Sequence, residues 1–191
     1  MSLQTTNSLH HRHPCRKVEK MSMNETPFVI AEATPDDIAV IREIAWKTFP
    51  ATYRSIISDE QIAYMMEWMY SEASLQRQMT IDHHTYLIAY LDGKAIGYVS
   101  VEPQGPHLWH LQKLYVLPEY QGSHCGSFLF RHATDYIRTH GELPCKMELN
   151  VNRNNKALDF YYRMGMRKDR QGDFDIGNGF FMNDYIMALD I

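Results

Sequence analysis

Two spacings of hydrophobic residues alternate along the chain, and each predicts a different element. Apolar side chains recur every three or four residues from Thr34 to about Phe49 and again from Ser58 onward, which predicts two amphipathic helices. Thr34-Pro35-Asp36-Asp37 supplies an N-cap hydroxyl, a proline at the first helical position and acids at the positive end of the helix dipole. Ser58-Asp59-Glu60-Gln61 is a second start signal, typical of a capping box.

Runs rich in β-branched and aromatic residues predict the strands. Thr85–Leu91 and Lys94–Val101 flank Asp92-Gly93, and this dipeptide predicts a type I′ hairpin because both turn positions need positive φ. Further strands are expected at residues 28–31, 108–116, 145–151, 166–171 and 179–191, and further helices from about residue 120 to Gly141 and over 156–164. The order is a strand, two helices, three strands, a helix, a strand, a helix and two strands. It predicts an α/β protein with a mixed sheet and one crossover connection for a parallel pair.

The first 26 residues differ from the rest of the chain. They show no hydrophobic period and are rich in Ser, Thr, Asn, His and basic residues, so we predict a mobile N-terminal tail and one domain over residues 27–191. The tail contains a group of metal-ligating residue types, His10, His11, His13 and Cys15. Because a tail fixes no ligand geometry, no metal site is predicted there.

Composition and charge restrict the classes of function. No apolar run approaches the roughly 20 residues that cross a bilayer, and three cysteines, Cys15, Cys125 and Cys145, build no disulfide scaffold. We therefore expect a cytoplasmic protein without a membrane partner. The net charge is −4, but residues 1–20 carry four basic residues and one acidic residue, which leaves −7 for the remainder. An acidic domain argues against a nucleic-acid partner and favours a cationic substrate.

The candidate chemistry lies between Leu111 and Leu129. A strand runs into a loop of small residues, Gln121-Gly122-Ser123-His124-Cys125-Gly126, which opens a helix. Free backbone N–H groups at such a helix start bind anions, so a phosphate-like ligand is predicted, with an ordinary tight turn as the alternative. The loop is neither a Walker loop nor a Rossmann fingerprint, since no Gly-Lys-Ser/Thr closes it and the Rossmann spacing is absent.

This loop resembles the Gln/Arg-x-x-Gly-x-Gly/Ala motif of the GNAT superfamily of acyl-CoA-dependent N-acetyltransferases. A second segment, Asn155-Lys156-Ala157-Leu158-Asp159-Phe160-Tyr161-Tyr162-Arg163-Met164-Gly165-Met166, resembles the family's Asn-x-Ala-x-x-Phe-Tyr-x-x-x-Gly-Phe. The resemblance covers roughly residues 28–170. It implies a GNAT-like mixed, mostly antiparallel twisted sheet with helices on both faces.

Two positions depart from the family pattern. Met166 replaces a phenylalanine, which is a tolerable apolar exchange. His124 replaces a glycine where the backbone would approach a pyrophosphate. Histidine adopts the left-handed region more readily than most residues, so the loop can still form, and a contact between His124 and a phosphate is left open.

The resemblance implies direct transfer of an acetyl group from acetyl-CoA, the co-substrate, to a primary amine, without a covalent enzyme intermediate. It implies that Tyr161 is the general acid towards the CoA sulfur, although by residue type alone a core position is the alternative. The strand backbone would bind the thioester and pantetheine arm, the loop amides would bind the pyrophosphate, and Asn155 would bind the pantetheine. The cofactor-binding residues implied are Leu114, Tyr115, Val116, Gln121, Gly122, Ser123, His124, Cys125, Gly126, Ser127 and Asn155.

The acceptor site is implied around the first two helices and the loop between them. Trp46, Phe49 and Tyr53 are the expected substrate-binding residues, because aromatic faces attract ammonium groups. Similarity to the polyamine-acetylating branch makes a polyamine or another small cationic amine the favoured acceptor, with a peptide amine left open. The general base is also open among His107, His110, Glu102 and Glu148. A non-catalytic acyl-CoA sensor or interaction module of the same fold is the alternative function, and a homodimer remains open.

Overall fold

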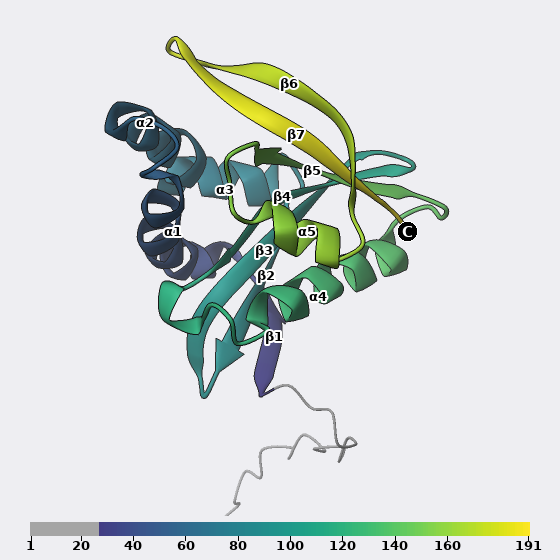
Figure 1. Ribbon diagram of the computed structural model, residues 1–191. Helices are drawn as coiled ribbons and strands as arrows, with labels where there is room; N and C mark the ends of the chain where they lie inside the picture. The colour runs from purple at the N-terminus through teal and green to yellow at the C-terminus, as the bar shows by residue number, and fades with distance from the viewer. Residues whose placement is uncertain (1–26) are drawn as a thin grey trace, which may run out of the picture.

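A seven-stranded sheet forms the centre of the computed structural model, which describes residues 27–191 (Figure 1). The predicted tail and its His and Cys residues lie outside this range. Across the sheet the strands follow the order β1-β2-β3-β4-β5-β7-β6. Neighbouring strands are antiparallel except β4 and β5, which are parallel. The strands are β1 Phe28–Glu32, β2 Thr85–Leu91, β3 Lys94–Gly105, β4 Leu108–Val116, β5 Lys146–Asn152, β6 Arg167–Gly177 and β7 Phe180–Asp190.

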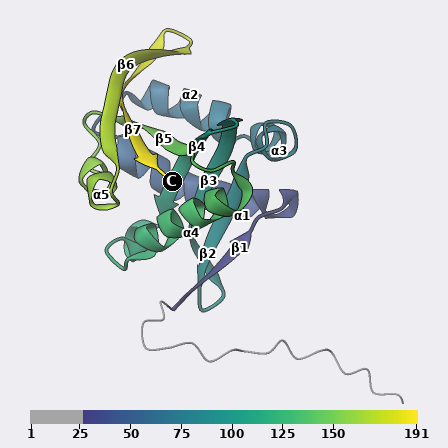
Figure 2. The same cartoon turned by 90° about the vertical axis from the view of Figure 1, so that its right-hand side faces the viewer.

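Helices cover both faces of this sheet, as Figures 1 and 2 show. On one face α1 Ile38–Tyr53, α2 Asp59–Tyr70 and α3 Glu72–Thr80 enclose a core that contains Phe49, Tyr70 and Tyr98. On the other face α4 Cys125–His140 and α5 Leu158–Arg163 enclose a second core. Short 3-10 turns, η1 Pro35–Asp37 and η2 Pro118–Tyr120, precede α1 and α4. The expected fold class is confirmed, including the single parallel pair.

Local sequence signals account for several boundaries. Asp92 and Gly93 both have positive φ, at 48° and 78°, as the predicted hairpin turn requires. The Asp37 carboxylate accepts a hydrogen bond from the Thr34 backbone N–H at 2.8 Å, which completes a capping box before α1. Ser58 Oγ accepts from the Gln61 N–H at 3.1 Å at the start of α2.

One helix was not expected. Sequence periodicity predicts two helices before the hairpin, whereas the structure has α3 as a third, directly after α2. It buries only Leu75 and Gln78, so it shows too little apolar periodicity to be recognised. Ser71 explains its start, because this residue ends α2 and its side chain then accepts from the Ser74 N–H.

A separation between β4 and β5 positions the candidate site. The two strands pair only from Leu108 to His110 and from Lys146 to Glu148, and beyond these residues they diverge. The register of β4 against β3 also shifts between Leu111 and Lys113. The divergence opens the middle of the sheet at the end where α4 begins.

No helix in residues 27–191 is long and apolar enough to cross a membrane.

Candidate active site

A cleft of about 780 Å³ lies between the separated strands β4 and β5 and reaches the N-terminus of α4. Its walls come from the end of α1, β4, the loop before α4, β5 and α5. The expected site residues that line it are Tyr53, Leu114, Tyr115, Val116, Gln121, Gly122, His124, Gly126, Ser127, Asn155 and Tyr161. Both motifs, separated by about 30 residues in the sequence, therefore face one cavity.

The loop before α4 has the backbone conformation of an anion cradle. Gly122 has φ 83° and His124 has φ 68° and ψ 5°, so a histidine does occupy the left-handed region at the N-cap of the helix. The intrahelical hydrogen bond at this end runs from the Phe128 N–H to the His124 carbonyl at 3.0 Å. The N–H groups of the preceding turn are therefore free of intrahelical partners and directed along the helix axis, where a pyrophosphate would bind.

Two loop residues lie apart from the lining. Ser123 is exposed, and its hydroxyl donates to the Tyr120 carbonyl. Cys125 is buried in the core beneath α4, and burial raises the pKa of its thiol to about 11. The thiol is therefore protonated at neutral pH and unsuited to nucleophilic attack.

Three tyrosines gather where β4 and β5 separate. Tyr53 from α1, Tyr115 from β4 and Tyr161 from α5 all line the cleft. Burial raises the pKa of all three phenols, and the nearby Asp184 carboxylate helps to bring that of Tyr53 to about 12. Each hydroxyl is therefore protonated at neutral pH and can donate a hydrogen bond or a proton.

The other two expected acceptor-site residues lie elsewhere. The Phe49 ring is fully buried behind the cleft, with its centroid 4.5 Å from that of Tyr53 and 6.2 Å from that of Tyr115. Trp46 is 57% exposed and lies outside the lining. Trp46 is therefore not brought together with Tyr53 in this cleft, and its role in binding an acceptor stays a prediction. Phe49 supports the site from behind and does not face it.

Basic residues that the sequence reading did not single out also line the cleft. Lys156 and Arg163 belong to the second motif segment, and Lys113 comes from β4. Aspartate and glutamate are absent from the described lining. Such a cleft suits an anionic ligand. The adjacency of Lys156 to the motif residue Asn155 was a signal that could have identified it.

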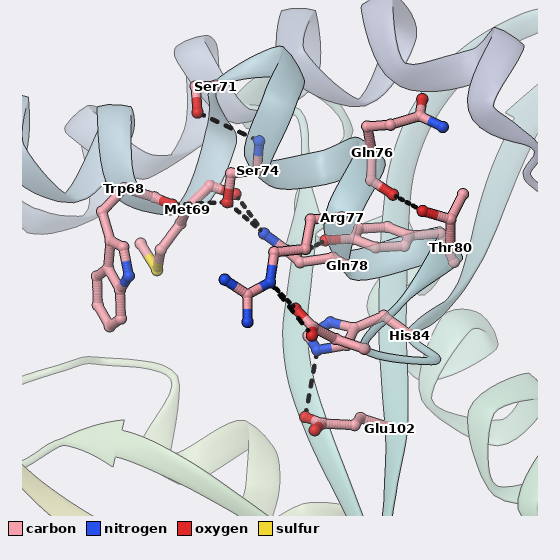
Figure 3. Close-up of polar contacts among 12 residues, drawn as sticks. Trp68, Met69, Ser71, Ser74, Gln76, Arg77, Gln78, Thr80, His84 and Glu102 are labelled. Carbon is pink, nitrogen blue, oxygen red and sulfur yellow. Dashed lines mark hydrogen bonds and ion pairs between the residues drawn. The ribbon is translucent and has the colours of Figure 1, made fainter.

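Lys113 is the most unusual of these residues because its side chain is buried. Its Nζ donates to Gln78 Oε1 at 2.6 Å and lies 5.7 Å and 5.3 Å from the ring centroids of Tyr70 and Tyr86. Gln78 in turn donates to the Met69 carbonyl and Ser74 Oγ, as Figure 3 shows. Burial lowers the pKa of Lys113 to about 7, against a smaller opposing effect of Glu102.

The side chains of all four candidate bases have hydrogen-bond or ion-pair partners in the structure. His107 Nδ1 lies 3.0 Å from the Glu142 carbonyl, and the Glu148 carboxylate binds Arg170 at 2.7 Å. Glu102 contacts His84 Nε2 at 3.3 Å (Figure 3). Burial lowers the pKa of His84 to about 4, so at pH 7 this contact is a hydrogen bond that the neutral His84 ring donates to the Glu102 carboxylate. His110 contacts Asn150, a residue of the cleft wall.

Comparison with known proteins identifies the family. The sequence model of the Acetyltransferase (GNAT) family matches residues 38–166, and the chain belongs to this family. It is an N-acetyltransferase with acetyl-CoA as its co-substrate. The cleft fits that ligand, since it combines the free helix N-terminus with Lys156 and Arg163. In residues 27–191 no cluster of His, Cys, Asp or Glu is arranged to hold a metal ion.

Three relatives illustrate the similarity. An uncharacterized N-acetyltransferase of Mycobacterium tuberculosis is 27% identical over 81% of this chain and 98% of its own length. Spermidine N(1)-acetyltransferase of Thermoplasma acidophilum is 26% identical over 72% of this chain and 87% of its own. The crystal structure of PaiA N-acetyltransferase from Thermoplasma acidophilum in complex with coenzyme A superposes with a TM-score of 0.72 at 26% identity, covering 86% of this chain and 99% of that one.

Proposed function

We propose that this chain transfers the acetyl group of acetyl-CoA to the primary amine of a small cationic molecule, with a polyamine such as spermidine as the first candidate. The observation that carries the proposal is that Tyr161 and the residues at the free N-terminus of α4 line the same cleft. One end can hold a pyrophosphate while the other offers a protonated phenol. This is the arrangement that a thioester donor requires.

The proposed roles follow from the chemistry of each group. The amides of α4 and its preceding loop hold the pyrophosphate, and Lys156 and Arg163 supply positive charge at the same end. The backbone of Leu114 to Val116, which lines the cleft, holds the pantetheine arm and the thioester, beside Asn155. The amine attacks the thioester carbon, the carbon–sulfur bond breaks, and Tyr161 protonates the departing sulfur. The acetyl group thus passes directly to nitrogen.

The acceptor class rests on charge and on one relative. The chain outside residues 1–20 has a formal charge of −7, which attracts cationic amines. A relative that is 26% identical is named as a spermidine N(1)-acetyltransferase. Both observations favour a polyamine over a peptide amine.

Two measurements test the proposal. Calorimetric titration with acetyl-CoA is expected to show binding, and release of the CoA thiol is expected when spermidine, spermine, a lysine peptide, a peptide with a free N-terminus or an amino sugar is added. Tyr161→Phe should lower kcat by about 10²-fold, since general acids contribute 10²–10⁴-fold. Its affinity for acetyl-CoA should stay unchanged. Binding without turnover of any amine would favour the acyl-CoA sensor instead.

Location and assembly belong to the same proposal. A cytoplasmic site agrees with the free thiols of Cys125 and Cys145. A homodimer agrees with the exposed edge of β6, which pairs with β7 on its inner side and carries mostly exposed residues. Light scattering of the purified protein and fractionation of its cells test these two points.

A further inference from the structure

Three polar residues on neighbouring strands form a chain of hydrogen bonds at the point where β4 and β5 separate. His110 lies at the last paired position of β4, Asn150 follows on β5, and Asp184 lies on β7. His110 Nε2 lies 3.1 Å from Asn150 Oδ1, and Asn150 Nδ2 lies 3.3 Å from Asp184 Oδ2. Asn150 also forms part of the cleft wall, so this row of hydrogen bonds is in contact with the cleft.

The direction of these bonds is fixed by the amide between them. Because Asn150 donates through Nδ2 to the carboxylate, its Oδ1 is the acceptor and His110 must donate from Nε2. Burial lowers the pKa of His110, so the ring is neutral at pH 7 with its proton on that nitrogen. The imidazole thus orients the amide, and the amide orients one oxygen of Asp184.

The other oxygen of Asp184 has no hydrogen-bond partner among residues 27–191. Asp184 is only 5% exposed, and its Oδ1 is buried without a hydrogen bond. A buried carboxylate oxygen without a donor is costly, so it points to a ligand that brings one. Asp184 forms no salt bridge with any of residues 27–191, in contrast to Glu148, which pairs with Arg170.

Asp184 lies behind the cleft wall, next to Asn150 and Tyr53, which line the cleft, while Asp184 itself is not part of the lining. Burial raises the pKa of the Asp184 carboxyl, while Asn150 and the guanidinium of Arg153 oppose the rise. Arg153 itself is engaged by the Gly172 carbonyl and by Asp173, at 2.9 Å and 2.7 Å. On the side of α1, the Asp184 charge raises the pKa of Tyr53, whose side chain lines the cleft.

We propose that Asp184 Oδ1 accepts, by way of one water molecule at the cleft wall, the proton that the acceptor ammonium must lose before attack, and that Asn150 and His110 are positioning residues for this carboxylate. The inference rests on the proposed function. A primary amine binds as R–NH₃⁺, passes one proton to Asp184 and attacks as R–NH₂. A second proton leaves the nitrogen when the amide forms and reaches the CoA sulfur by way of the Tyr161 hydroxyl. Asp184 then releases its proton to solvent, so the sum is one amide, one thiol and one proton.

The test compares Asp184→Asn with Asp190→Asn across pH, using CoA release with spermidine and with the other amines of the panel. Asp190 lies on the same strand, is exposed and pairs with Arg167, so its variant controls for the loss of a carboxylate. Asp184→Asn should lower kcat/KM by about 10²-fold near neutral pH, because a general base contributes 10²–10⁴-fold. The KM for acetyl-CoA should not change.

The shape of the pH profile separates a catalytic role from a structural one. Without Asp184 only the amine that is already neutral reacts, so kcat/KM of Asp184→Asn should climb about tenfold per pH unit up to the amine pKa. In the protein without this substitution, kcat/KM should stay constant over the same pH range. Lys113 on β4 also titrates in this pH range. Because both proteins contain Lys113, its effect cancels when kcat/KM of the variant is divided by kcat/KM of the unsubstituted protein. Asn150→Ala should move the acidic limb to higher pH, because Asn150 lowers the pKa of Asp184.

Each outcome has a separate meaning. A folded Asp184→Asn enzyme with normal kcat/KM and an unchanged pH profile would overturn the inference alone. Loss of activity with the same pH profile would also overturn it, because this would indicate a structural role. No turnover by the unchanged chain with any amine would overturn the proposed function, and the inference with it. Asp184→Glu, which keeps the carboxylate, should restore part of the activity if proton transfer is the role.

Discussion

The Nζ of Lys113 and the hydroxyl of Tyr86 both donate to Gln78 Oε1, each at 2.6 Å. A lysine in the core of the sheet is therefore held by neutral partners. Glu102 acts on it only through space. Such a lysine is easier to bury neutral than charged, which is why its pKa falls to about 7.

Replacement of Lys113 by methionine should make stability less dependent on pH. The folded pKa of Lys113, about 7, lies below its unfolded value, so the unfolded chain binds more protons between these two values. The free energy of unfolding should therefore rise with pH by up to about 1.4 kcal/mol per pH unit above pH 7. Urea unfolding of both proteins between about pH 7 and pH 9 measures this slope.

Lys113→Met should show a smaller slope, and Lys47→Met is the control because Lys47 is exposed and pairs with Glu43. Equal slopes in all three proteins would show that Lys113 stays charged in the fold.

Substitutions at His124 should separate backbone strain from ligand contact. His124 has φ 68°, so glycine should stabilise the protein by about 0.5–1 kcal/mol and alanine should leave the strain in place. Affinity for acetyl-CoA should change little in both variants, because the backbone amides remain. Thermal unfolding with and without acetyl-CoA measures both quantities.

A large loss of affinity in both His124 variants would mean that the imidazole binds a phosphate. Tight binding by the glycine variant alone would mean that the side chain obstructs the loop.

Lys156→Ala should weaken acetyl-CoA binding by about tenfold, since a hydrogen bond to a charged group contributes about 1.5–3 kcal/mol. The loss should shrink as salt is added. Calorimetry at two salt concentrations measures it. Lys168→Ala is the matched control because Lys168 lies on β6 over the Tyr185 ring, outside the cleft lining. Equal affinities for both variants would remove Lys156 from the proposed phosphate site.

Gly97→Ala should destabilise the protein by about 1–3 kcal/mol, in the range of overpacked sites. A Cβ at this position would lie 2.7 Å from the Tyr115 carbonyl oxygen and 3.2 Å from Leu129. Because Tyr115 lines the cleft, acetyl-CoA affinity should fall as well. Gly105→Ala on the same strand meets nothing within 4 Å and should be neutral. Chemical denaturation of the two variants decides the point, and equal stability would contradict the expectation.

Local signals in the sequence predicted the parts of the fold that depend on neighbouring residues. Asp92-Gly93 specified its hairpin and the residues around Gly122 specified the loop before α4, because turn chemistry and helix starts are decided within a few positions. The two motifs were enough to bring Tyr161 and the loop to one site.

Features that depend on register could not be predicted in this way. Asp184 faces Asn152 across two strands that are distant in sequence, so nothing near it shows that it is buried beside the cleft. Trp46 is expected at the site from the resemblance and from its residue type, whereas the neighbouring Ala45 is the residue that α1 turns towards the core. The sequence around Lys113 predicts an ordinary polar strand residue. Its burial depends on helices that pack over it in the folded structure, so it could not be predicted locally.

The strand order has a consequence for synthesis on the ribosome. β7 is made after all other strands, yet it lies between β5 and β6 and supplies Asp184. The first four strands pair in sequence order and can assemble as they emerge, whereas β5 must wait for residues 180–190. During this interval one edge of β5 is unpaired, and a nascent chain that stalls there would carry both motif segments without β7 and Asp184.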